Sequence, residues 1–324
     1  MKLKPESTFI NKYKPYYIND FYISDNLKQT IHTLIELDNL NLLFVGNSCS
    51  GKTSLLYAIV REYYGMSNND SFPEYNTLFI NNLKEQGIQY FRTEMKTFCQ
   101  SRSSIYGKKK MVIIDDIDSI NEQSQQVFRN YIDKYKNNIH FISVCGNLQK
   151  VIESIQSRTH IIRLDQPTNT DITHIMNKII DAEKIIIDEE SKGYLLKIAD
   201  NSIRLMINFI EKIYILDMPI NIQLCKKLVS TISDDILEEY INHIQNNDIH
   251  KAIHTLYNIF DCGYSVIDIL DYFISFVKQT SILPEDVKYE IIPFLCKYIT
   301  IVHNIHEDEI ELALFTNNLK SLLT

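Results

Sequence analysis

Eight residues in the first fifth of the chain combine a phosphate-binding pattern with a lysine and a hydroxyl group. They are Gly46, Asn47, Ser48, Cys49, Ser50, Gly51, Lys52 and Thr53, and they follow the pattern G-x-x-x-x-G-K-T. Glycines at both ends let the backbone curl so that its N–H groups point at phosphate oxygens. In such a loop the lysine reaches the β- and γ-phosphates, and the threonine hydroxyl ligates Mg²⁺. The pattern therefore predicts a site for a nucleoside triphosphate.

The flanks of this loop match the structure that the pattern requires. The apolar run at residues 42–45 predicts a buried strand, and residues 54–60 have the periodicity of a helix. A chance glycine turn is the alternative. It is disfavoured because the chain has only 8 glycines and both flanks are correct.

A second stretch, residues 111–118, consists of four apolar residues followed by a segment rich in aspartate. Asp115 stands where a carboxylate would hold Mg²⁺, directly or through water. Asp116 stands where a general base would orient the attacking water. An acidic turn after a buried strand is the alternative, but the preceding phosphate loop favours the catalytic interpretation.

Short apolar runs alternate with helical patterns over the first half of the chain. The runs at 42–45, 77–80, 111–114, 139–144 and 160–164 predict a parallel α/β sheet with helices on both faces. Ligands of such sheets bind at the carboxyl ends of the strands, where Gly46, Asp115 and Asn147 fall. Beyond Pro167 only helical patterns continue. We therefore expect three domains: 1–165 with the nucleotide site, then helical domains at 166–231 and 232–324.

Composition excludes several classes of protein. Hydrophobic residues make up 45% of the chain and charged residues 23%, and no apolar run is long enough to span a membrane. The 6 cysteines are scattered without a C-x-x-C pair, which argues against zinc and predicts a soluble protein of a reducing, intracellular compartment. A net charge of −8 argues against indiscriminate nucleic-acid binding. Residues 84–110 are a local exception, because basic residues outnumber acidic ones there.

Several further segments together carry a family resemblance. Residues 9–15 resemble W-x-x-K-Y-R-P, and residues 81–92 resemble N-A-S-D-x-R-G-I-x-x-I-R. Residues 115–118 stand for D-E-A-D, residues 125–129 for Q-Q-A-L-R, and residues 151–158 for I-I-E-P-I-Q-S-R. With these motifs the chain resembles the small subunits of replication factor C, the AAA+ sliding-clamp loaders. The resemblance covers residues 9–215 by motif and the rest only by helical content.

The resemblance implies roles for residues that the two main motifs leave out. ATP with Mg²⁺ would lie between the sheet domain and a helical lid, 166–231, and the segment with Tyr13 would fold over the adenine. Asn147 would sense the γ-phosphate, with Gly146 as the alternative because the following segment is one residue short. Arg204 resembles the sensor arginine of the lid, and a surface arginine is the alternative. Arg158 would reach the ATP site of the neighbouring subunit, and a structural ion pair is the alternative.

The resemblance also implies partners. The chain would join other clamp-loader subunits, with 232–324 as a collar, in a hetero-oligomer expected to be a pentamer. It would bind a sliding clamp and primer–template DNA, the DNA through Arg92 and the backbone N–H of Ile88, and no membrane. Lys108–Lys110 stay open between a DNA contact and a solvated loop. The compartment would be the nucleus or another site of DNA replication, such as the cytoplasmic replication compartment of a large DNA virus.

One departure from the family pattern bears on activity. Asp116 replaces a glutamate, and a side chain shorter by one methylene would weaken general-base catalysis. Two alternatives to an active ATP-hydrolysing loader subunit therefore remain. One is a scaffold subunit that binds ATP and hydrolyses little of it, and the other is a different AAA+ DNA-processing ATPase.

Overall fold

The computed structural model describes residues 7–67, 70–80, 88–199, 201–216, 218, 220–228, 232–304 and 308–323. The chain divides into two compact units, Met1–Leu228 and Val229–Thr324, and each is described by itself. Residues 81–87 of the family-like segment 81–92 lie outside the described residues.

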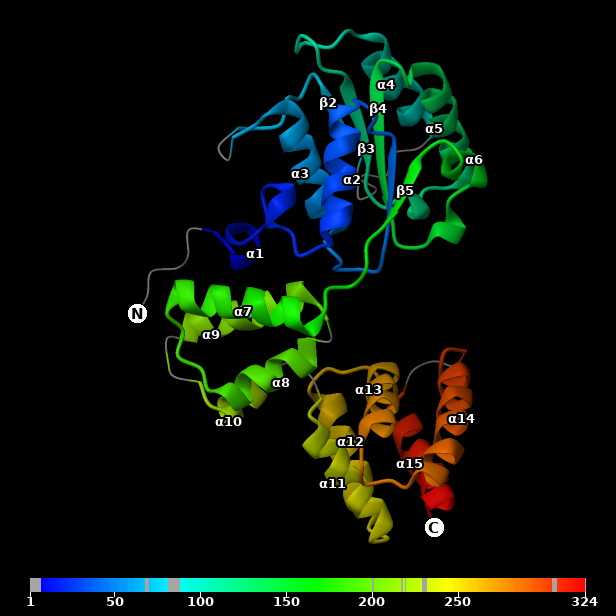
Figure 1. Cartoon of the computed structure of the whole chain (residues 1–324). Helices are drawn as coiled ribbons and strands as arrows, with labels where there is room; N and C mark the ends of the chain where they lie inside the picture. The colour runs from blue at the N-terminus through cyan, green and yellow to red at the C-terminus, as the bar shows by residue number, and fades with distance from the viewer. Residues whose placement is uncertain are drawn as a thin grey trace. The chain divides into compact units, whose positions relative to one another are not determined.

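Five strands in the first unit form one parallel sheet (Figure 1). They are β1 (Leu42–Val45), β2 (Thr77–Ile80), β3 (Lys110–Ile114), β4 (Ile139–Cys145) and β5 (His160–Arg163), in the order β2-β3-β4-β1-β5. The register pairs Leu42 of β1 with Ile142 on one side and with His160 on the other. All seven residues of β4 are buried, as expected for a central parallel strand. The predicted α/β fold class is confirmed.

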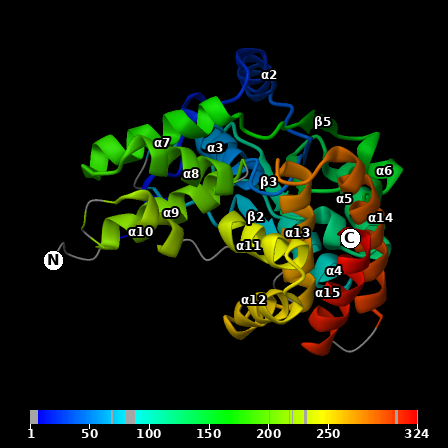
Figure 2. The same cartoon turned by 90° about the horizontal axis from the view of Figure 1, so that it is seen from below.

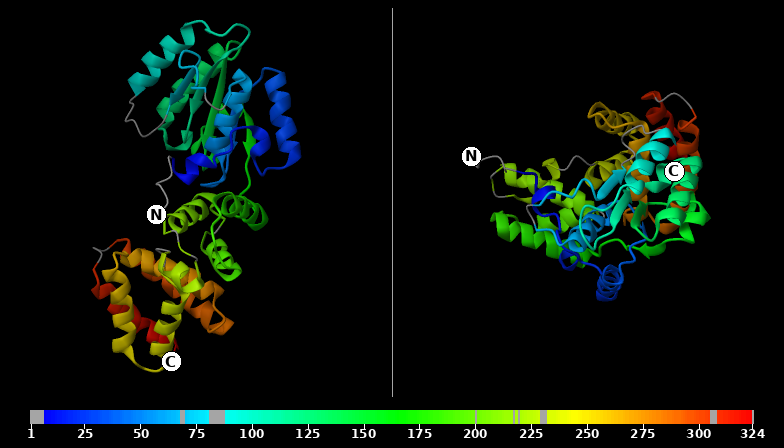
Figure 3. Two further views of the ribbon diagram at one scale, coloured as in Figure 1. Left: turned by 90° about the vertical axis from the view of Figure 1, so that its left-hand side faces the viewer. Right: turned by 90° about the horizontal axis from the view of Figure 1, so that it is seen from above.

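Helices cover both faces of this sheet, because successive strand residues point to opposite sides. On one face α2 (Asp25–Glu36) and α3 (Lys52–Tyr64) pack on Phe44 and Ile142. On the other face α4 (Ile88–Gln100), α5 (Glu122–Tyr135) and α6 (Glu153–Gln156) contribute to a core around Leu43 and Phe141. Figure 3 shows the sheet edge-on between α4 and α2. The sheet therefore has buried faces on both sides and free loops at its ends.

Short helical turns occupy several of the connections. They are α1 (Phe9–Lys12) and the 3₁₀ helices η1 (Ile18–Asp20), η2 (Ile117–Ser119) and η3 (Leu148–Lys150). Two of them, η2 and η3, lie just beyond the carboxyl ends of β3 and β4. They therefore shape the edge of the sheet where the site was predicted.

The rest of the first unit is helical, with α7 (Asn169–Glu183), α8 (Glu189–Ala199), α9 (Ile203–Leu216) and α10 (Ile222–Leu228). Thr168 and Asp171 form a capping box at the start of α7. The core of this part includes Met176 and Met206, and Phe9 from α1 is fully buried in it. The amino-terminal segment therefore packs on residues more than 160 positions away.

The second unit contains five helices within the described residues, coloured yellow to red in Figure 2. They are α11 (Asp234–Gln245), α12 (Ile249–Asp261), α13 (Val266–Gln279), α14 (Glu285–Val302) and α15 (Ile310–Leu323). Tyr240, Phe273 and Phe315 fill the centre, and the buried Tyr240 hydroxyl lies 3.1 Å from the hydroxyl of Thr316. Within the described part of the chain, no helix is long and apolar enough to cross a membrane.

Candidate active site

The predicted phosphate loop connects the carboxyl end of β1 to the amino end of α3, and two of its glycines are required there for different reasons. A Cβ on Gly46 would lie 2.6 Å from the carbonyl oxygen of Leu164, so no side chain fits. Gly51 has φ +86°, in the left-handed region that glycine adopts without strain. Cys49 also has a left-handed backbone, with φ +62°. The loop is therefore curled as the motif predicts.

Lys52 begins α3 and is 8% exposed. Its Nζ donates hydrogen bonds to the carbonyl oxygens of Gly46, at 2.8 Å, and Asn47, at 2.7 Å. The loop thus folds around its own ammonium group. A positive charge held at this point lies where a bound phosphate would need it.

Ser50 supplies an independent indication that the loop fits a phosphate. Its Oγ is buried and has no hydrogen-bond partner among the residues that the structure describes. Buried polar atoms in folded proteins almost always have a partner. An oxygen of a phosphate bound by the loop would supply one to Ser50.

Thr53 and Asp115 meet across the site from two elements. The Thr53 Oγ1 donates to the Asp115 carboxylate, at 3.3 Å from Oδ1 and 3.2 Å from Oδ2. Burial and the neighbouring Asp116 raise the pKa of Asp115, and the bond from Thr53 opposes this. A bound divalent cation would relieve that cost, and a hydroxyl with a carboxylate is a donor set that suits Mg²⁺. Among the described residues, no group of three or more His, Cys, Asp and Glu side chains is arranged to hold a metal ion.

Asp116 follows directly and is exposed. Its backbone has φ +53° and ψ 52°, in the left-handed region, and it begins the turn η2. A non-glycine residue in this region is uncommon and occurs often at functional sites. The predicted base is therefore presented from a sharp turn and not from the end of an extended strand.

Asn147 lies two residues beyond Cys145, the last residue of β4. The Cys145 carbonyl oxygen accepts a hydrogen bond from the N–H of Gly46 in the phosphate loop at 3.3 Å. The Asn147 side-chain oxygen accepts the N–H of Gln149 at 2.9 Å and so caps η3. Since β3, β4 and β1 are neighbours in the sheet, their carboxyl ends bring Asp115, Asn147 and the phosphate loop to one edge. Gly146 offers only its backbone at this point.

Arg158 lies at the other end of the sheet. It precedes β5, whose first residue His160 pairs with the first residue of β1, whereas the phosphate loop follows the last residue of β1. The Arg158 Nε donates to Asp133 at 2.7 Å, and Nη1 donates to the carbonyl oxygen of Ser154 at 2.8 Å. Arg158 lowers the pKa of Asp133 through this bond. The ion pair that was the alternative interpretation is therefore present, and both partners are partly exposed.

The structure does not bring Tyr13 and Arg204 to the phosphate loop. The Tyr13 hydroxyl donates to Glu183 at the end of α7, and burial with this bond raises its pKa. Arg204 is exposed in the first turn of α9. Within the described part of the chain, no hydrogen bond or ion pair joins either side chain to residues 46–53. Ile88 begins α4, and the side chains of Ile88 and Arg92 lie outside what the structure describes.

Sequence reasoning missed three polar residues that connect these loops. Asp118 binds two backbone N–H groups beyond β4. Gln125, 1% exposed, donates to the carbonyl oxygens of Ile117, Ile120 and Lys150 and accepts the N–H of Ile152. Asp133 holds Arg158. The first two stand inside motifs quoted above, but their partners could not be read from sequence spacing.

Two family models match the chain. The model of the ATPase family associated with various cellular activities (AAA) matches residues 42–165, and that of the replication factor C C-terminal domain matches residues 232–298. The RuvB Holliday junction branch migration motor of Thermotoga maritima is similar in structure, with a TM-score of 0.52 over 67% of this chain and 72% of that chain. At 14% identity this similarity shows the fold alone.

Relatives in sequence cover most of the chain. A replication factor C small subunit of Thermoplasma volcanium is 27% identical over 294 residues, 88% of this chain and 88% of the relative. Replication factor C subunit 4 of Schizosaccharomyces pombe is 24% identical over 289 residues, 89% of this chain and 83% of the relative. With these relatives and both domain models, the chain belongs to the replication factor C small-subunit family of AAA+ clamp loaders.

Proposed function

We propose that this chain is an ATP-hydrolysing subunit that helps to load a sliding clamp onto primer–template DNA during replication. One observation carries the proposal: the Thr53 hydroxyl and the Asp115 carboxylate lie together beside a curled loop that encloses Lys52. A lysine, a hydroxyl and a carboxylate in this arrangement are the groups that bind a triphosphate with Mg²⁺. The buried hydroxyl of Ser50 supports the same proposal.

Each part of the site has one task in this proposal. The backbone N–H groups of residues 46–53 and the Lys52 ammonium bind the phosphates of ATP. Thr53 and Asp115 hold Mg²⁺, which neutralises charge on the phosphate oxygens. Asp116 orients and deprotonates the attacking water, and Asn147 donates a hydrogen bond beside the γ-phosphate. The segment with Tyr13 covers the adenine, and Arg204 of the lid contacts the phosphates.

Assembly completes the site from outside the chain. Arg158 lies at the opposite end of the sheet from the phosphate loop of its own chain, so we assign it to the ATP site of a neighbouring subunit. The neighbours are other clamp-loader subunits, in a hetero-oligomer that we propose to be a pentamer. Residues 1–165 form the ATPase domain, 166–231 the lid and 232–324 the collar. Arg92 and the Ile88 N–H contact DNA phosphates, which fixes position without reading sequence.

A second candidate is a subunit that binds ATP, donates Arg158 and hydrolyses little of its own nucleotide. Asp116 favours it, because its side chain is shorter than glutamate and starts from a left-handed turn. The replication factor C relatives and the match at residues 232–298 favour either form of loader subunit over an unrelated AAA+ motor.

Steady-state ATP hydrolysis by the assembled complex separates the two candidates. The change Lys52→Ala removes the phosphate-binding cation, and turnover should fall at least tenfold at this subunit's site. The change Asp116→Glu should alter turnover less than threefold if Asp116 is already a working base. A rise of tenfold or more after Asp116→Glu identifies the scaffold subunit, and unchanged turnover after Lys52→Ala rules out a working site here.

A further inference from the structure

A single carboxylate oxygen joins the two loops that flank the proposed site for the γ-phosphate. Oδ2 of Asp118 accepts the backbone N–H of Gly146 at 3.0 Å and that of Asn147 at 2.8 Å. Asp118 belongs to η2, the turn that Asp116 begins, whereas Gly146 and Asn147 follow β4. We propose that Asp118 is a positioning residue that holds the Gly146–Asn147 turn in register with Asp116. The proposal rests on the function proposed above.

The contact suits a fixed connection between the η2 turn and the Gly146–Asn147 turn. Both hydrogen bonds are charge-assisted, and such bonds are about twice as strong as neutral ones. A Cβ on Gly146 would lie 3.4 Å from Oδ2, which is ordinary van der Waals contact, so the two hydrogen bonds do not depend on the absence of a side chain there. The two N–H groups lie at the end of a strand and have no place in the sheet ladder, so Asp118 supplies the partner that they need.

These contacts determine which polar group of Asn147 is available to bind a ligand. Its main chain is held by Asp118, and its side-chain oxygen is occupied by the N–H of Gln149. An amide whose oxygen is used in this way presents its NH₂ group as the available donor. That donor suits a γ-phosphate oxygen or the attacking water, and it has no counterpart to bind in ADP.

Hydrogen bonds within the η2 turn also connect Asp118 to the proposed general base, Asp116. The Ser119 N–H and hydroxyl both donate to the carbonyl oxygen of Asp116, at 3.0 and 2.6 Å, and close the η2 turn. Asp116 and Asp118 therefore sit on one hydrogen-bonded turn, and Asn147 is attached to that turn through Asp118. A γ-phosphate that displaces Asn147 would also displace Asp116, through the Asp118–Asn147 hydrogen bond and the hydrogen-bonded η2 turn. Recognition of the γ-phosphate and activation of the water would then depend on the same structural unit.

The test is nucleotide discrimination by the full-length chain, measured by calorimetry with Mg²⁺ and either ADP or a non-hydrolysable ATP analogue. In Asp118→Ala, the preference for the ATP analogue over ADP should fall at least fivefold, while ADP affinity stays within twofold. In Asp118→Asn, which retains an acceptor oxygen, at least half of the lost preference should return. The change Asn147→Ala should give the same loss, and the double variant should lose no more.

Asp188→Ala is a matched control, because Asp188 also accepts a backbone N–H, from Ser191 at 2.8 Å, far from the site in sequence. Equal losses of ADP and ATP-analogue affinity in Asp118→Ala, or an unchanged preference, would overturn the proposal. Hydrogen exchange of the Gly146 and Asn147 amides without nucleotide gives a second readout. It should accelerate at least tenfold in Asp118→Ala and not in Asp188→Ala, and no acceleration would also overturn it. A wild-type chain that binds neither nucleotide overturns the proposed function itself.

Discussion

The backbone of Cys49 has a conformation that residues other than glycine disfavour. Cys49 stands in the phosphate loop with φ +62°, in the left-handed region. Left-handed backbone costs an ordinary residue about 1–2 kcal/mol, whereas glycine adopts it freely. The loop therefore keeps its shape because the surrounding contacts hold it, with Lys52 bonded to two of its carbonyl groups.

We expect Cys49→Gly to keep the affinity for a Mg²⁺–ATP analogue within about twofold, because the loop retains its backbone conformation. The change Cys49→Val should weaken binding roughly tenfold, since a β-branched residue is a true outlier at positive φ. Calorimetric titration of the three chains measures the difference. Cys99→Val, at a buried helical position, is the control for valine itself. Equal affinity in Cys49→Val and wild type would show that the loop tolerates this strain.

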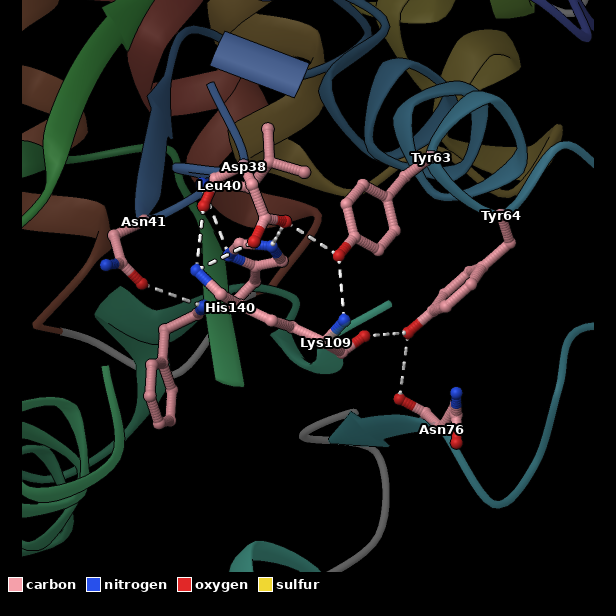
Figure 4. A network of polar contacts seen from close by, with 9 residues as sticks. Asp38, Leu40, Asn41, Tyr63, Tyr64, Asn76, Lys109 and His140 are labelled. Carbon is pink, nitrogen blue, oxygen red and sulfur yellow. Dashed lines mark hydrogen bonds and ion pairs between the residues drawn. The ribbon is translucent and has the colours of Figure 1, made fainter. Parts of the chain in front are cut away.

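At the scale of the elements, a polar network joins the amino end of the sheet to α3 (Figure 4). The Asp38 carboxylate accepts hydrogen bonds from the Tyr63 hydroxyl at 2.8 Å and from His140 Nε2 at 2.9 Å, and it forms an ion pair with Lys109 at 2.9 Å. The Leu40 N–H donates to Nδ1 of His140, so the proton of the neutral ring is on Nε2. The network thus selects one neutral tautomer of a buried histidine.

This histidine makes stability depend on pH. Burial lowers the pKa of His140 to about 4, although Asp38 opposes the shift. In the unfolded chain the ring takes up its proton near pH 6.5, so the unfolded state binds more protons between pH 6.5 and 4. The contribution of His140 to stability is therefore full above pH 6.5 and is lost on acidification to pH 4. The slope reaches up to about 1.4 kcal/mol per pH unit.

Replacing His140 with glutamine, which has no proton to gain, should flatten this part of the pH dependence. We expect the melting temperature of the wild type to fall more steeply than that of His140→Gln between pH 6.5 and 4.5, as measured by circular dichroism. His160→Gln is the control, since His160 is exposed at the start of β5. Parallel pH curves for the wild type and His140→Gln would show that the ring does not carry the effect.

The elements also show what a sequence can and cannot predict. The five strands were predictable because a parallel sheet buries both faces and so makes each strand a continuous apolar run. Asp115 and the phosphate loop were predictable because their motifs place them at strand ends. The partners of Asp38, Asp118 and Asp133 were not, because each contact joins residues 25 or more positions apart. Burial of Phe9 against Met206 is a longer-range case of the same limit.

At the scale of the whole molecule, Arg158 is the residue whose proposed task lies outside its own chain. It stands at the amino end of β5, whereas the phosphate loop leaves the carboxyl end of β1 in the same parallel sheet. The ion pair with Asp133 does not oppose that task, because both side chains are partly exposed. An exposed ion pair contributes only about 0–1 kcal/mol, so exchanging Asp133 for a phosphate oxygen costs little.

We therefore expect Arg158→Ala to separate binding from assembly. The isolated chain should bind the Mg²⁺–ATP analogue within about twofold of the wild type, because Arg158 lies at the opposite end of the sheet from its own site. In the reconstituted complex the hydrolysis that depends on this arginine should fall by roughly 10³-fold or more, the loss typical of an arginine supplied in trans. Single-turnover hydrolysis, with the other ATP sites disabled at their phosphate-loop lysines, isolates that neighbouring site.

Lys136→Ala is the matched control, since Lys136 also lowers the pKa of Asp133 but, among the described residues, forms no hydrogen bond or ion pair with it. If Lys136→Ala slowed hydrolysis as much as Arg158→Ala, a general charge effect would explain both losses. If Arg158→Ala instead weakened binding in the isolated chain tenfold, Arg158 would serve its own site, contrary to its place at the far end of the sheet. Only loss in the complex with binding intact in the chain fits an arginine that completes the neighbour's site.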